Sequence, residues 1–140
     1  MSCKSNPELK DFTYTFSIEN VNNFKAEFQL NPDSTYKVTQ INYFFDNFEG
    51  KKRPLIKEGQ LTAEEFNSFK KLITGSNIQG MKDSYGFDNP TKESDIIYMV
   101  QLTVDGQTKY VSVNENTPEK FPKDFTELIA YTTEFINGNK

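Results

Sequence analysis

The feature that most constrains the fold is an alternating run that leads directly into a tight turn. Every second residue from 96 to 104 is apolar, which is the period of a half-buried β-strand. Asp105-Gly106 follows, and it suits a type I′ turn because both central positions of that turn need a positive φ. A two-residue loop sets Val100 opposite Val111, so apolar residues meet on one face. The segment therefore predicts a β-hairpin with one buried side.

The first third of the chain contains three more candidate strands. Apolar and polar residues alternate over 12–18 and again over 24–30, which predicts two half-buried strands. A third strand starts with Tyr36 and Val38 on one parity and continues with Ile41 on the other. A change of parity requires one extra residue, so we expect a β-bulge near 39–40.

Two segments have the periodicity of amphipathic helices. Thr62 and Glu65 have the spacing of a capping box, and the apolar stripe that follows predicts a helix over 63–74. Gly75 is the expected left-handed stop of that helix. A second apolar stripe predicts a helix over 123–136.

The order of these elements indicates the fold class. The chain has 140 residues, the size of one domain. We expect residues 1–11 to be a flexible N-terminal tether and 12–140 to be a single α+β domain. It would have two layers, a mostly antiparallel sheet with both helices on one face. The pattern forms a structural pseudo-repeat of hairpin and helix: 24–45 with 63–74, and 96–113 with 123–136.

Charge and missing residue types narrow the possible functions. The chain has 16 Lys and Arg against 20 Asp and Glu, a net charge of −4, which disfavours nucleic acid and anionic membrane surfaces. It has no His, and this excludes Ser-His-Asp and Cys-His catalysis and most zinc sites. We therefore expect no nucleic-acid partner, no metal and no cofactor. We also expect the protein to be a monomer.

Paired carboxylates are the remaining catalytic option, and the sequence indicates no such pair. Glu64 and Glu65 lie at a helix N-terminus, where negative charge is favoured. Asp124 and Glu127 lie in the first turn of the other helix. Asp95 has no such explanation, but one carboxylate is not a site. We predict no catalytic residues.

Two segments between the predicted elements are candidate binding surfaces. In the first, Phe44 and Phe48 lie near Arg53, which is the only Arg of the chain. Exposed rings beside a guanidinium group can stack on a sugar, a base or a side chain of a partner.

The second segment lies in the unpatterned stretch 75–95, where Tyr85 and Phe87 are the candidate binding residues. The favoured interpretation is a surface loop, held on the core by Met81 and these two rings. Calcium is an alternative, although the spacing does not match an EF-hand. Its oxygen ligands would be Asp83, Ser84, Asp88 and Asn89.

The start of the chain resembles a processed lipoprotein. Cys3 is the only Cys, it follows the small residue Ser2, and polar residues come after it. With 13 Phe and 7 Tyr in a small α+β body, the chain resembles small cell-envelope lipoproteins of Gram-negative gut anaerobes. The resemblance implies an acylated Cys3 and attachment to the outer membrane, with no other membrane contact. The alternative is a cytoplasmic protein with an incidental Cys.

The second half of the chain resembles another family. Residues 98–106, 110–113 and 125–136 follow a strand, Asp-Gly turn, strand and helix order that is similar to emfourin-like domains. Those domains are small bacterial inhibitors of thermolysin-type metalloproteases. Their glycine-rich strand start is absent, because residues 20–23 read Asn-Val-Asn-Asn instead, so no inhibitory residue is transferred.

These observations predict a non-enzymatic, lipid-tethered domain of the cell envelope that binds a protein or a glycan. One alternative is a module similar to a protease inhibitor. The alternative from another class is a small hydrolase that depends on two carboxylates.

Overall fold

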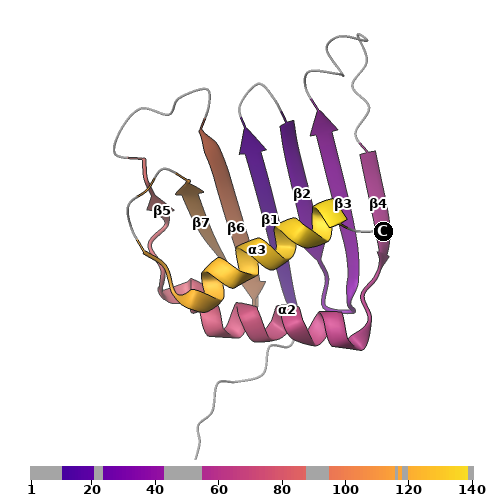
Figure 1. Ribbon diagram of the computed structural model, residues 1–140. Helices are drawn as coiled ribbons and strands as arrows, with labels where there is room; N and C mark the ends of the chain where they lie inside the picture. Colours follow the sequence, from indigo (N-terminus) through magenta and orange to yellow (C-terminus); the bar gives the residue numbers. More distant parts are fainter. Residues whose placement is uncertain are drawn as a thin grey trace, which may run out of the picture.

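The computed structural model describes residues 11–20, 24–42, 55–87, 95–115, 117 and 120–138 (Figure 1). The helices are α2 (Ala63–Ser76) and α3 (Lys123–Gly138), with a short 3-10 helix η1 (Ile78–Gly80). The strands are β1 (Phe12–Asn20), β2 (Phe24–Leu30), β3 (Thr35–Asn42), β4 (Leu55–Gln60), β5 (Ser84–Tyr85), β6 (Ile96–Val104) and β7 (Gln107–Asn114).

The described strands form one sheet, in the order β4-β3-β2-β1-β6-β7-β5. Neighbouring strands are antiparallel except β5 and β7, which are parallel. Both α2 and α3 lie on the same face of this sheet, and α3 crosses it obliquely (Figure 1). The predicted two-layer α+β fold with a mostly antiparallel sheet is therefore confirmed.

The central strand β1 explains where the core lies. Phe12, Tyr14 and Phe16 are buried on the helix side, whereas the alternate residues are polar and only partly buried. The register continues this pattern across the sheet, because Phe16 pairs with Phe28 on one side and with Val100 on the other. One face of the sheet is thus packed under the helices, and the other is open and mostly polar, with exposed apolar side chains such as Ile56 and Met99.

The hairpin of β6 and β7 has the predicted turn and register. Val100 lies opposite Val111, as the two-residue loop requires. Asp105 has a φ of 54° and Gly106 a φ of 77°, which are the two positive values of a type I′ turn.

The β-bulge predicted near 39–40 is wrong. β3 pairs continuously with β2, and Thr39 lies opposite Glu27 in an unbroken register. Ile41 therefore stays opposite Lys25, on the face away from the helices. The change of apolar parity arises from an apolar residue on the open face, not from an inserted one.

The start of α2 is confirmed, but its predicted end is wrong. The Thr62 hydroxyl accepts from the Glu65 amide at 3.1 Å, and the Glu65 carboxylate accepts from the Thr62 amide at 2.9 Å. The helix continues past Gly75, and the left-handed cap is Asn77, with a φ of 53°. Gly75 is where α3 passes closely, because a Cβ there would overlap the carboxylate of Asp124.

Rings fill the layer between the sheet and the C-terminal half of α3. Phe69 of α2 stacks on Phe28 with centroids 5.2 Å apart, and Tyr131 of α3 meets Phe69 at 4.8 Å. Phe135 meets Tyr36 edge-on at 5.1 Å. We call these five residues the aromatic cluster.

Candidate functional site

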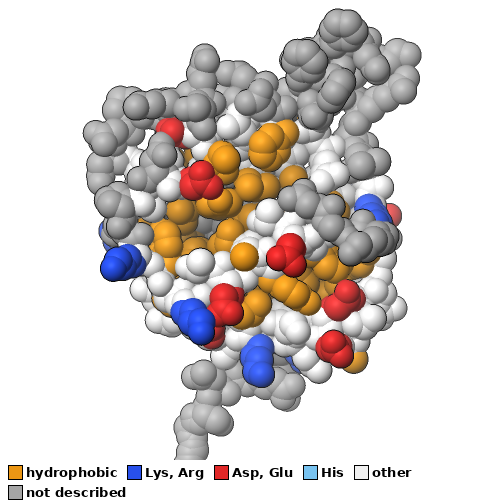
Figure 2. All heavy atoms as spheres, viewed as in Figure 1, with side chains coloured by type: hydrophobic (Ala, Val, Ile, Leu, Met, Phe, Trp, Pro, Cys, Tyr) orange, Lys and Arg blue, Asp and Glu red, His pale blue; other side chains and the backbone are white. Residues whose placement is uncertain are grey.

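A pocket of about 740 Å³ lies between one flank of α3, the start of β6 and the end of β7. In Figure 2, apolar side chains line a hollow above α3. The apolar part of the lining comes from Tyr98, Val113, Phe121, Phe125, Ile129 and Ala130. The polar part comes from Glu115, Thr117, Thr126, Thr133 and Glu134.

The pocket exists because small side chains follow one flank of α3. Thr126, Ala130 and Thr133 are spaced four and three residues apart, so they lie on one side of the helix. All three line the pocket, beside the stripe that packs into the core. α3 crosses the sheet obliquely (Figure 1), and the space beside these short side chains remains open as the pocket.

The polar contact at the pocket joins Tyr98 and Glu115. Tyr98 stacks on Phe16 with centroids 6.0 Å apart, and its hydroxyl donates to Glu115 Oε2 at 2.7 Å. Burial, and then the hydrogen bond and negative charge of Glu115, raise the pKa of Tyr98. Tyr98 is therefore a neutral hydrogen-bond donor near neutral pH and is not set up as a base or nucleophile.

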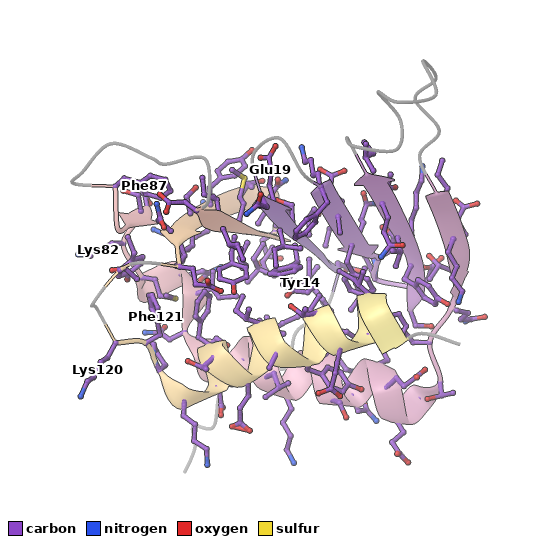
Figure 3. The ribbon with its side chains drawn as sticks, turned by 45° about the horizontal axis from the view of Figure 1, so that its top comes forward. Tyr14, Glu19, Lys82, Phe87, Lys120 and Phe121 are labelled. Atoms are coloured by element: carbon purple, nitrogen blue, oxygen red, sulfur yellow. The ribbon has the colours of Figure 1, made fainter. Side chains whose placement is uncertain are left out.

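Phe121 forms the wall of the pocket that precedes α3. Its ring meets Tyr85 edge-on at 4.9 Å and Phe125 at 5.4 Å. Figure 3 shows Phe121 directed toward the protein, while the neighbouring Lys120 extends into solvent. The wall is thus apolar, and the adjacent cation points away from it.

The predicted site residues have different outcomes. Phe44, Phe48, Arg53 and Cys3 lie outside the described residues. Tyr85 is buried, with its hydroxyl accepting from the Lys82 amide at 2.9 Å.

The predicted anchoring of the second loop is correct for two of its three residues. Met81 and Tyr85 are buried, which confirms that this segment is held on the core. Phe87 does not join them, because 36% of its surface is exposed and its ring lies toward the outside (Figure 3).

The calcium alternative is not supported by the described part of its ligand set. Asp83 accepts from Lys109 Nζ at 2.7 Å, so a cationic side chain already neutralises it. Asp88 and Asn89 lie outside the described residues. In the described ranges, no three His, Cys, Asp or Glu side chains come together as a metal site would require.

Asp95, which the sequence did not explain, is a buried polar residue with 4% exposure. Asn114 Nδ2 donates to its Oδ2 at 3.0 Å, so the start of β6 is joined to the end of β7. This bond satisfies polar groups that would otherwise be costly to bury. A structural role in the hairpin accounts for the residue.

Sequence reasoning missed the pocket. Phe125 and Ile129 belong to the apolar stripe of α3, and the stripe alone predicts only that they face the core. The sequence feature that could have indicated the pocket is the row of small side chains at positions 126, 130 and 133, which lies beside this apolar stripe on the helix surface.

No protein-family model matches the chain, and a search of curated proteins finds no significant similarity. None of the described helices is both long and apolar enough to cross a membrane.

Proposed function

We propose that this chain is a non-enzymatic binding domain, and that it takes an apolar side chain of a protein partner into the pocket beside α3. The observation that carries the proposal is the hollow of about 740 Å³, with rings and aliphatic groups in its lining. Its volume falls within the range of ligand sites, about 300–1,000 Å³. Burial of apolar surface there would contribute about 25 cal/mol per Å².

The lining favours a protein over a glycan. A sugar would lose hydrogen bonds to water over most of its surface, and apolar groups cannot replace them. The Phe121 ring is also packed against Tyr85 and Phe125, which limits its use as a stacking platform. An aliphatic or aromatic side chain has no such cost, since it exchanges water for apolar contacts.

The polar groups of the pocket support binding without catalysis. Tyr98 keeps its proton and donates it in a hydrogen bond to Glu115. A general base or a nucleophile would need the opposite, a group that gives up its proton near neutral pH. The two carboxylates of the lining, Glu115 and Glu134, are both exposed, so neither has the buried setting that commonly tunes a catalytic acid or base.

Site-specific photocrosslinking tests the proposal in cells. A benzophenone amino acid replaces Thr126 at the rim of the pocket, and Ala63 on α2 is the matched control position, because both are exposed helix residues. We expect a defined adduct from position 126 and none from position 63. Ala130→Trp, which fills the pocket from an exposed position, should abolish the adduct.

Equal adducts from both positions, or an adduct that persists in Ala130→Trp, would contradict the proposal. The identity of the partner also decides between the two kinds of binding module. A thermolysin-type protease at position 126 would identify the inhibitor alternative.

We further propose that a lipid on Cys3 holds the domain at the outer membrane. The support is the sequence around Cys3, with a polar segment between it and the start of β1. In the protein expressed from its natural gene, Cys3→Ser should move the domain from the membrane fraction to the soluble fraction. Ser2→Ala, which keeps a small residue before the Cys, is the control and should stay with the membrane.

A further inference from the structure

Among the described residues, every charged side chain that lines the pocket is negative. Glu115 follows β7, and Glu134 lies on α3, so the two carboxylates come from different elements. Both are exposed, which allows a ligand to reach them. Lys120, which is close to Glu115 in the sequence, extends away from the pocket into solvent (Figure 3). The rim of an apolar hollow therefore carries negative charge.

Glu115 is held in place at this rim. Its backbone amide donates to the carbonyl of Ile96 at 2.9 Å, and its Oε2 accepts from the Tyr98 hydroxyl at 2.7 Å. A carboxylate has about four lone-pair sites, so one bond from a phenol leaves capacity for a cationic donor. A carboxylate oriented before binding loses less conformational freedom when the ligand arrives.

We propose that the pocket selects an apolar side chain with Lys or Arg beside it, so that its partner is a basic amphipathic segment of a protein. The apolar side chain enters the hollow, and the flanking cations meet Glu115 and Glu134. This inference rests on the proposed function and adds the charge of the partner to it. The net charge of −4 on the whole chain also favours the approach of a positively charged segment.

Three matched peptides test the charge preference. Each has a Leu-Phe-Leu centre with blocked ends, and the two flanking residues are Lys, Gln or Glu. Binding is measured by NMR shifts of the amides of pocket residues. Two exposed ion pairs are expected to give the Lys peptide about fivefold higher affinity than the Gln peptide, and the Glu peptide about fivefold lower.

Salt and charge-removing variants give a second readout. At about 1 M salt the Debye length is about 3 Å, so the Lys peptide should weaken toward the Gln peptide. Glu115→Gln combined with Glu134→Gln should remove the preference, so that the Lys, Gln and Glu peptides then bind this variant with equal affinity. Glu64→Gln, an exposed change on α2, is the control and should keep the preference.

The outcomes separate this inference from the proposed function. If all three peptides bind equally and Ala130→Trp blocks them, the charge inference is wrong and the pocket still binds apolar side chains. If none binds, or if Ala130→Trp has no effect on binding, both are wrong. A preference for the Glu peptide would also overturn the inference.

Discussion

α3 covers the two ends of the sheet in different ways. Over β1, β2 and β3, the C-terminal half contributes Tyr131 and Phe135 to the aromatic cluster. Over β6 and β7, the flank of α3 that carries Thr126, Ala130 and Thr133 leaves the pocket open. One helix therefore closes the interior at one end and leaves it accessible at the other.

Two tyrosines on neighbouring strands show the same difference. Tyr14 has no exposed surface, and its hydroxyl meets Thr132 Oγ1 of α3 at 2.8 Å. Tyr98 is partly exposed, and its hydroxyl reaches Glu115 at the rim of the pocket. At the closed end, under the aromatic cluster, the tyrosine hydroxyl has its hydrogen-bond partner in the interior. At the open end, beside the pocket, the partner lies at the surface. The comparison predicts that stability is concentrated at the closed end, and the proposed function places recognition at the open end.

Removal of a large ring should have the largest effect, and the comparison predicts where. Phe69→Ala in the aromatic cluster is expected to lower the free energy of unfolding by about 3–5 kcal/mol, because Phe69 is fully buried and its removal leaves a cavity. Phe121→Ala at the pocket wall should cost less than about 2 kcal/mol, since that ring is already partly exposed. Urea unfolding with unchanged m values measures both, and equal losses would refute the comparison.

Loss of a hydrogen-bond partner should also matter more at the closed end. Thr132→Val keeps the shape of the side chain but leaves the hydroxyl of Tyr14 buried without this partner, at a cost of about 1–3 kcal/mol. Glu115→Ala leaves Tyr98 near water and should cost less than about 0.5 kcal/mol. A larger loss for Glu115→Ala, measured by the same urea melts, would mean that the open end also contributes to stability.

The turn between β6 and β7 offers a way to weaken the open end without touching the pocket. Gly106 has a φ of 77°, and its added Cβ would meet no atom, so the penalty of a substitution is purely conformational. Gly106→Val should cost about 1–2 kcal/mol, whereas Gly106→Asn should cost less because Asn tolerates this region. Thermal unfolding of both variants checks the order. Equal midpoints would mean that the backbone of this turn differs from type I′.

Alkaline pH should have a smaller effect than the loss of a buried ring. Burial raises the pKa of Tyr14 above its ordinary value of 10.0, although the hydrogen bond with Thr132 opposes this. Above that pH the unfolded chain releases the proton while the folded protein keeps it, so stability falls as pH rises. The loss from this one tyrosine is about 1 kcal/mol over the first pH unit above 10.0. In Tyr14→Phe, the free energy of unfolding should fall by about 1 kcal/mol less over this pH unit than in the unmodified protein. An identical fall in both proteins would show that Tyr14 titrates normally when folded.

Patterns within a few residues predicted much of the fold. The Asp105-Gly106 turn and the capping box of Thr62 and Glu65 were predictable because each depends on neighbours in sequence. The errors arose where distant elements meet. Gly75 serves the close approach of α3 at Asp124, and Ile41 lies on the open face of the sheet. The binding roles of Phe44, Phe48 and Arg53, like the lipid on Cys3, stay predictions because these residues lie outside the described ranges.

By itself, the amino-acid sequence determined which side of β1, β2, β6 and both helices is buried, because that depends on a local repeat of two or about 3.6 residues. It also determined the negative charge and the absence of His. Only the tertiary structure decided that Ala130 and its neighbours on α3 border a pocket instead of a packed layer. That outcome depends on the angle at which α3 crosses the sheet. The angle results from the packing of Tyr131 and Phe135 against rings that are distant in sequence, Phe69 of α2 and Phe28 of β2.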